Sequence, residues 1–279
     1  MPQLLFYDKA VPVSAERHRD LSVKTGTSYG FASKVNSVPL TAIEFAQAAA
    51  EYPIVFAGTE EVVMPCVILG ASASRNVFVT KAGAWLGKYI PAFVRRYPFV
   101  FAQDTTGKNL ILHVDESFEG CNRDGRGERL FDTDGNQTQY LRNVLSFLQD
   151  YQLRFNRTRR YCERLKELEL LRPMEASFNT PDGERHSLSG FMTVDRDKLK
   201  ALPGEELAKL AAVDELECTY LHLFSLRHFG AIAEKFTVDG DVEQAATGSD
   251  PVIEGATPKS SRAKEKDQEK GTVEAAADA

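Results

Sequence analysis

Two nearly identical hexapeptides mark the positions where the chain changes from helical to extended patterning. Residues 52–57 read Tyr-Pro-Ile-Val-Phe-Ala and residues 97–102 read Tyr-Pro-Phe-Val-Phe-Ala. Each follows a segment with helical spacing, and each precedes a glycine-containing turn and a second apolar run. Because proline disfavours the helical conformation of the residue before it, Tyr52 and Tyr97 are predicted to end helices. The pattern predicts two helix–strand–turn–strand units in one mostly antiparallel sheet.

The helices ahead of these hexapeptides have recognisable starts. Thr41 and Glu44 have the spacing of a capping box, which predicts a helix over residues 42–51. Residues 90–96 predict a shorter helix with proline in its first turn. We therefore expect both Tyr-Pro pairs to occupy equivalent helix-to-strand junctions.

The second half of the chain is predicted to be richer in helix. From Thr138 onward, apolar residues recur at steps of three and four, which predicts a long helix near residues 138–171. A kink between residues 154 and 159 is an alternative. Residues 174–178 and 186–194 flank a Thr-Pro-Asp-Gly turn, which predicts a β-hairpin. Residues 216–236 predict a closing amphipathic helix, so the expected fold class is α+β with a largely antiparallel sheet.

Residues 237–279 differ in composition from the rest of the chain. They contain ten acidic and five basic residues, a single isoleucine and no aromatic residue. Such a segment buries too little apolar surface to offset the entropy lost on ordering. We therefore predict one α+β domain over residues 1–236 and a disordered acidic tail over residues 237–279.

The charge balance and the positions of the cysteines exclude several classes of protein. Residues 1–236 carry 29 basic and 30 acidic residues, without the basic surplus of a nucleic-acid-binding protein. No apolar run approaches the ~20 residues that a membrane-spanning helix needs, so no membrane insertion is expected. The cysteines are dispersed and lack a C-x-x-C pair, and no secretory signal is evident at the N-terminus. These features predict a cytoplasmic protein with reduced thiols, at Cys66, Cys121, Cys162 and Cys218.

Several segments together resemble the SapC family, over about Leu4 to Phe236. They are Glu-Arg-His-Arg-Asp at 16–20, Val-Asn-Ser-Val-Pro-Leu at 35–40, Glu-Tyr-Pro-Ile-Val-Phe at 51–56, Tyr-Ile-Pro-Ala-Phe-Val-Arg-Arg-Tyr-Pro-Phe at 89–99, Leu-Phe-Asp at 130–132, and Gly-Phe at 190–191 ahead of Val-Asp at 194–195. The resemblance implies association with bacterial surface-layer systems and with TonB-dependent receptors. It assigns no catalytic residue, no cofactor and no metal.

One pattern suggests a metal-dependent alternative. His113 and Asp115 are separated by one residue at the end of a predicted strand. With a distant histidine, this spacing supplies two-thirds of the facial triad of non-haem iron oxygenases. His186 or His222 would complete the set. We favour the interpretation without a metal, in which His113 is a histidine at the end of a strand beside a carboxylate.

A second pattern suggests a binding surface. Arg95 and Arg96 lie between Phe93 and Tyr97 on the short predicted helix. Arginine beside aromatic surface suits recognition of a carboxylate or of an aromatic-rich peptide. We predict that at least one guanidinium reaches a cleft and contacts a partner.

These patterns favour a non-catalytic protein-binding or accessory module over an enzyme. The expected partner is a protein or peptide of a surface-layer or TonB-receptor-linked pathway, and no cofactor is expected. The alternatives are an iron- and 2-oxoglutarate-dependent oxygenase using His113 and Asp115, and a surface-layer component exported without a cleaved signal. The sequence does not specify an oligomeric state.

Overall fold

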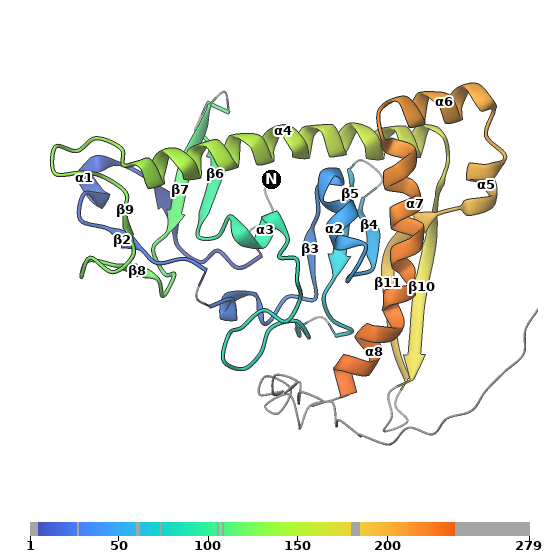
Figure 1. Ribbon diagram of the computed structural model, residues 1–279, viewed down its shortest axis with the longest axis horizontal. Coiled ribbons are helices and arrows are strands. Elements are labelled where there is room, and N and C mark those ends of the chain that lie inside the picture. The colour runs from blue at the N-terminus through green and yellow to red at the C-terminus, as the bar shows by residue number, and fades with distance from the viewer. Residues whose placement is uncertain are drawn as a thin grey trace, which may run out of the picture. The chain divides into compact units, whose positions relative to one another are not determined.

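The computed structural model describes residues 5–26, 28–59, 62–72, 74–104, 106–107, 109–179 and 185–237 (Figure 1). Its described part is an α+β fold built from antiparallel sheets and helices, as the sequence predicted. Apart from Thr237, the predicted tail lies outside the described residues. Within them, no helix combines the length and apolarity that crossing a membrane requires.

The larger sheet has five antiparallel strands in the order β10-β11-β4-β5-β3. The first hexapeptide enters this sheet as β4, which pairs with β5 from Ile54 opposite Val67 to Gly58 opposite Val63. The predicted hairpin is present as β10 and β11, and its turn lies outside the described residues. The strands are β3 (Ser37–Pro39), β4 (Ile54–Gly58), β5 (Val63–Ile68), β10 (Leu171–Asn179) and β11 (Arg185–Val194).

The second hexapeptide enters a different sheet, so the prediction of one sheet was wrong. Its strand pairs with the next one and with the first strand of the chain, in the order β1-β7-β6. Both edges of the β4–β5 hairpin are already occupied, by β11 and β3, and offer no place for β6. A third, small sheet has the order β8-β2-β9. These strands are β1 (Ala10–Pro12), β2 (Ser22–Val23), β6 (Phe99–Gln103), β7 (Leu110–Asp115), β8 (Cys121–Asn122) and β9 (Glu128–Arg129).

Both Tyr-Pro pairs occupy helix-to-strand junctions, which confirms that prediction. Tyr52-Pro53 lies between α2 (Phe45–Ala48) and β4, and Tyr97-Pro98 lies between α3 (Ala92–Arg95) and β6. The Tyr97-Pro98 peptide bond is cis. Both tyrosine side chains are buried. The repeated hexapeptide thus specifies a local junction without specifying which sheet its strand joins.

The Glu44 carboxylate ties the two units together. It accepts hydrogen bonds from the backbone N–H (2.9 Å) and hydroxyl (2.7 Å) of Thr41, as the capping-box spacing predicted. Its other oxygen accepts from the Tyr89 hydroxyl and from the backbone N–H of Ala92, each at 2.7 Å. The predicted helix over 42–51 is shorter in the structure and is divided into η2 (Ala42–Glu44) and α2.

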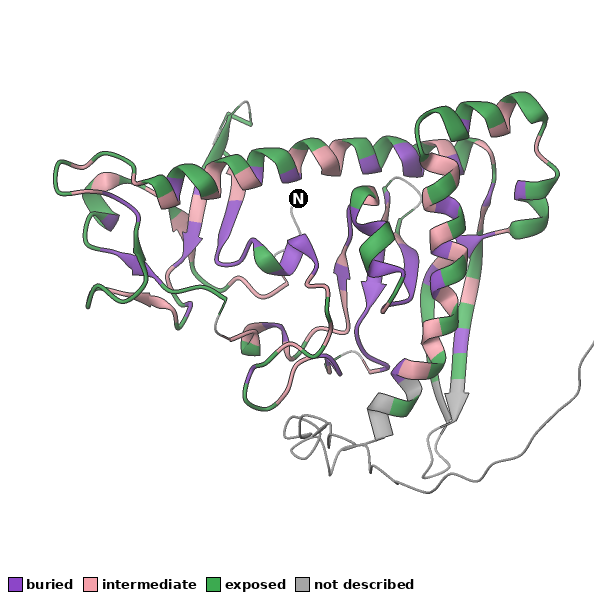
Figure 2. Cartoon of the chain, viewed as in Figure 1, coloured by how far each residue is buried: buried purple, intermediate pink, exposed green. Residues whose placement is uncertain are grey.

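Helix α4 (Gln139–Glu167) is the long predicted helix, and it packs on both main sheets. The Thr138 side chain accepts a hydrogen bond from the backbone N–H of Leu141 and caps its start. Buried positions recur along its length (Figure 2). Leu141 and Leu148 join the core beside β6 and β7, whereas Leu165 joins the core of the larger sheet. The helix ends four residues before the predicted boundary because Leu171 begins β10.

The predicted closing helix is divided into α7 (Glu215–Ser225), η3 (Leu226–His228) and α8 (Phe229–Thr237). Ser225 accounts for the break, since its hydroxyl donates to the backbone carbonyl of His222 at 2.6 Å. Such a bond competes with regular helical hydrogen bonding. The remaining described helical segments are α1 (Ala15–His18), η1 (Gly30–Ala32), α5 (Arg196–Lys200) and α6 (Gly204–Ala212).

Side chains of α7 complete the pairing between β4 and β11, which are in register only at Phe56 and Met192. The His222 Nε2 accepts from the Val194 backbone N–H at 3.1 Å, and its Nδ1–H donates to the Ile54 carbonyl at 2.8 Å. The Ser225 hydroxyl accepts from the Ile54 backbone N–H at 2.9 Å. A helix thus supplies hydrogen bonds that a neighbouring strand would normally supply.

We predict that His222 makes unfolding depend on pH. Burial lowers the pKa of its imidazole from the ordinary 6.5 to about 4. Between these values the unfolded chain binds more protons than the folded chain, so stability falls as pH falls through this window. The free energy of unfolding lost between neutral pH and a pH below about 4 is about 3 kcal/mol, from ~1.4 kcal/mol per pKa unit. Urea unfolding of the parent and of His222→Gln at several pH values measures it. Equal pH slopes for the two proteins would contradict the prediction.

Candidate functional site

The arginine pair on α3 lies at the predicted place, but its two members differ in environment. Arg95 is exposed, and its Nε donates to the Ile90 carbonyl at 2.9 Å. Its guanidinium lies 5.5 Å from the Phe147 ring centroid and 5.9 Å from that of Tyr89. Of the two arginines, only Arg95 is placed to contact a partner.

Arg96 is buried, with 7% of its surface exposed, among aromatic rings. Its guanidinium carbon lies 3.9 Å from the Phe93 ring centroid, 5.2 Å from that of Tyr151 and 5.8 Å from that of Tyr7. Its Nε and Nη2 have no hydrogen-bond partner in the described part of the chain. The charge is therefore stabilised by the aromatic faces and by a side-chain hydrogen bond with Tyr7. Phe93 and Tyr97 are also buried, so neither forms part of an exposed surface.

The Asp115 carboxylate holds main-chain segments together. One oxygen accepts from the Asp8 backbone N–H (2.8 Å) and the Tyr97 hydroxyl (3.3 Å). The other accepts from the Lys9 N–H (3.1 Å) and from the Ser117 N–H (3.0 Å) and hydroxyl (2.6 Å). Burial acts to raise the pKa of Asp115, but the hydrogen bonds from Ser117, Asp8 and Lys9 outweigh it and lower the pKa. These bonds give the carboxylate a structural role.

The histidines proposed to complete a metal site lie elsewhere or are not described. His222 uses both ring nitrogens on main-chain groups of β4 and β11. The side chain of His186 lies outside the described residues. His113 itself has Nδ1 3.0 Å from the Ile111 carbonyl. Among the described residues, no three His, Cys, Asp or Glu side chains gather closely enough to hold a metal ion.

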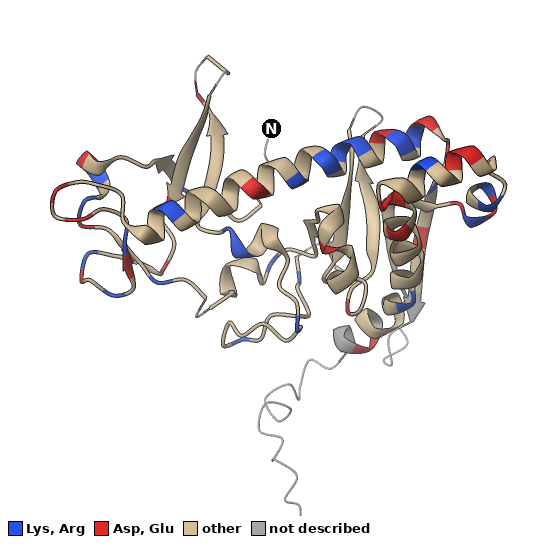
Figure 3. Ribbon diagram, turned by 45° about the horizontal axis from the view of Figure 1, so that its top comes forward, with Lys and Arg blue, Asp and Glu red and all other residues tan. Residues whose placement is uncertain are grey.

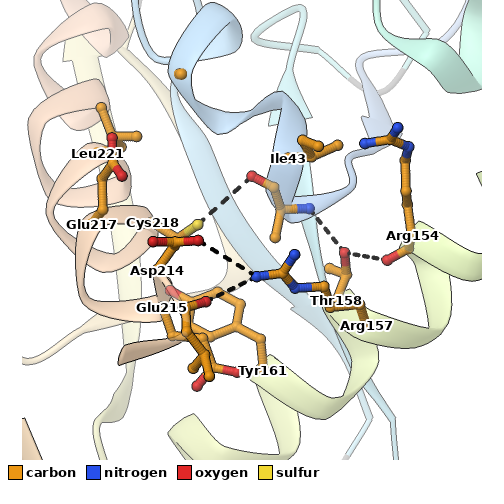
Figure 4. Close-up of a pocket in the computed structure, with 13 residues that line it drawn as sticks. Ile43, Arg154, Arg157, Thr158, Tyr161, Asp214, Glu215, Glu217, Cys218 and Leu221 are labelled. Carbon is orange, nitrogen blue, oxygen red and sulfur yellow. Dashed lines mark hydrogen bonds and ion pairs between the residues drawn. The ribbon is translucent and has the colours of Figure 1, made fainter. Parts of the chain in front are cut away.

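A groove of about 240 Å³ opens between α2, α4 and α7 (Figure 4). Tyr161 and Thr158 of α4 form part of its lining, and the Thr158 hydroxyl accepts from the backbone N–H of Ala42 at 2.8 Å. Apolar side chains line it and reach solvent, with Ile43 55% exposed and Val213 40% exposed. Its lining residues are Ala42, Ile43, Ala46, Arg154, Arg157, Thr158, Tyr161, Val213, Asp214, Glu215, Glu217, Cys218 and Leu221.

The charges of this groove are divided by sign between two elements. Lys and Arg gather on the C-terminal half of α4 (Figure 3), and Arg154 and Arg157 are the ones that line the groove. The opposite side carries Asp214 and Glu217. Arg157 donates to the Val213 carbonyl at 2.9 Å and lies 3.7 Å from the Asp214 carboxylate. Both charged side chains of this pair remain largely exposed, so the pair contributes little to stability.

The groove was missed by the sequence analysis because its residues come from three distant segments. The basic stretch of α4 is visible in the sequence, and it forms ion pairs such as Arg159 with Glu163 at 3.5 Å. Ile43 and Leu221 give no signal of their own, because an isolated exposed apolar residue is ordinary. Only the fold brings them together.

Comparison with known proteins identifies one family. The SapC family model matches residues 13–232, which is most of the chain. No match was found among curated proteins or among solved structures.

We predict that the two α3 arginines respond differently to substitution. In Arg96→Met the two unpaired donors disappear while most of the packing stays. Each such donor costs about 1–3 kcal/mol, against ~2 kcal/mol for a buried cation–π contact. The free energy of unfolding should therefore stay equal or rise. Arg95→Ala, an exposed change, should alter it by about 0.5 kcal/mol or less. Thermal melts of the two variants test this, and a large loss in Arg96→Met would show that the contacts of Arg96 with Tyr7 and the aromatic rings outweigh its unpaired donors.

Asp115→Asn is predicted to lower the free energy of unfolding by about 2–4 kcal/mol, because an amide NH₂ would face backbone donors. His113→Ala, two positions away on the same strand, should have a much smaller effect. Urea unfolding compares the two variants.

Elemental analysis of the parent protein supplies an independent check, since we expect no stoichiometric metal. About one iron per chain, lost in His113→Ala, would instead favour the oxygenase.

Proposed function

The chain belongs to the SapC family, and we propose that it is a non-catalytic protein-binding module. In this proposal it acts in the cytoplasm as an accessory to a surface-layer or TonB-receptor-linked pathway. The family resemblance supports the choice of pathway. The binding activity rests on the groove between α2, α4 and α7, which is the observation that carries the proposal (Figure 4).

The groove has the features of a docking surface. Apolar side chains on both sides reach solvent. Ile43 and Ala46 on one side are exposed, and Leu221 on the other is partly exposed. Polar and charged side chains surround this apolar surface, as in the rim of a protein–protein interface. Most of the lining lies on helices, with Val213 and Asp214 in the turn between α6 and α7, so little conformational entropy is lost when a partner binds.

The buried polar side chains support the same interpretation. Glu44, Asp115 and His222 each bind backbone groups, and each holds two or more segments of the chain together. Burial raises the pKa of the Cys66 and Cys121 thiols to about 12, which keeps them protonated and weakly nucleophilic at neutral pH. These groups are therefore suited to maintaining the fold rather than to acid–base or nucleophilic chemistry.

Site-specific cross-linking in the native cell tests the proposal. A photo-reactive residue at Ala46, on the groove, should form a discrete covalent complex with another protein chain. The same residue at Leu110, which is 48% exposed on β7, is the matched control and should not. Ile43→Asp should lower the yield at Ala46 by about tenfold, because it places a charge in the apolar centre of the contact.

Equal cross-linking at Ala46 and Leu110 would remove the groove from the proposal. Fractionation of the same cells tests the compartment. Recovery of the protein at the cell surface would favour the exported surface-layer alternative.

A further inference from the structure

We infer that the partner bound at the groove is a second copy of this chain, joined across a two-fold axis. The inference rests on the proposed function, because it takes the groove as a docking surface and names its occupant. It is carried by the distribution of charge on either side of the apolar surface.

The groove carries opposite charges on opposite sides. Figure 4 shows Arg154 on α4 and Glu217 on α7, on either side of Ile43. Glu217 is exposed and forms no ion pair within the described part of the chain. Within the described part of the chain, Arg157 has a long contact to Asp214 and a bond to the Val213 carbonyl. Arg154 is paired on its own helix, with its Nε 2.6 Å from the Asp150 carboxylate, so the charges that remain available to a partner are those of Arg157 and Glu217.

A two-fold axis through the apolar surface makes this pattern complementary to itself. In an isologous contact, each contact forms twice. If residue i of one copy meets residue j of the other, then residue j of the first copy also meets residue i of the second. A second copy turned by half a rotation places its α7 acids against the α4 arginines of the first, and its arginines against the acids of the first. The exposed Ile43 side chains then lie near the axis and cover each other.

Partners with one sign of charge fit this groove less well. An acidic segment would pair with Arg154 and Arg157 but would face Asp214 and Glu217 as like charges. A basic segment would meet the reverse problem. Like charges placed together across an interface cost several kcal/mol, so a partner with both signs is favoured.

Charge reversal on the full-length protein tests the inference. Sedimentation velocity over a range of concentrations should show a reversible dimer for the parent. Arg157→Glu and Glu217→Arg should each raise the dimer dissociation constant by at least about tenfold, because each places like charges together in the homodimer. An equimolar mixture of the two variants should restore the parent affinity, because both cross-axis contacts become attractive in the mixed dimer.

Matched controls separate this result from damage to the fold. Arg159→Glu makes the same change on α4 but outside the groove lining, and it should leave the dissociation constant unchanged. Ile43→Asp disrupts the centre of the contact without touching an ion pair, and it should abolish the dimer. Thermal melts of every variant identify any that is unfolded.

A parent protein that is monomeric throughout, or a dimer that survives both reversals and Ile43→Asp, would overturn the inference. The proposed function would then still be judged by the cross-linking at Ala46. A covalent complex with a different protein there, together with a monomeric parent, would retain the binding module and reject the second copy. A monomeric parent without a cross-link would reject both.

Discussion

The larger sheet depends on hydrogen bonds that no strand supplies. Strands β4 and β11 belong to parts of the chain that are far apart in sequence, and they are in register at one residue pair. His222 and Ser225 of α7 satisfy both backbone groups of Ile54 and the N–H of Val194. Without these side chains, buried backbone groups would lose their partners at a cost of about 1–3 kcal/mol each. The helix is therefore part of the sheet's hydrogen bonding as well as its cover.

Buried carboxylates fix the other junctions by the same physical means. Glu44 joins the start of η2 to the start of α3, and Asp115 joins the segment around Asp8 to the turn after β7. Each carboxylate accepts several N–H or O–H donors, which offsets the cost of removing its charge from water. The chain connects short elements with these polar contacts, because strands of two or three residues offer few ladder hydrogen bonds of their own.

Local features of the fold could be predicted from the sequence, because their determinants are adjacent. The contact of Glu44 with Thr41, the junctions at Tyr52 and Tyr97, and the start of α4 after Thr138 each depend on a few neighbouring residues. The division into three sheets could not be predicted, because it depends on which strand edges remain unpaired after distant segments have met. The break at Ser225 depends on a hydrogen bond to a backbone carbonyl and on contact with β4.

The candidate site shows the same limit. Arg95 and Arg96 are adjacent in the sequence, yet one is exposed and the other lies among aromatic rings contributed by three segments. The groove residues Ile43, Arg157 and Glu217 come from segments more than 50 residues apart. Sequence periodicity predicts which face of a helix is buried, but it does not predict which other helix leaves a groove beside it.

Helix α4 gives this arrangement a mechanical property. It is a single helix of 29 residues, and at 1.5 Å per residue its length is roughly 44 Å. Its C-terminal half lines the groove, whereas Leu141 near its N-terminus is embedded in the core of the second sheet. The helix is thus a rigid lever. The α4 residues that line the groove, Arg154 to Tyr161, lie roughly 22–33 Å from the first residue of the helix, so a tilt of about 5° at the groove displaces that end by roughly 2–3 Å. Helix α4 thus connects the groove directly to the core of the second sheet.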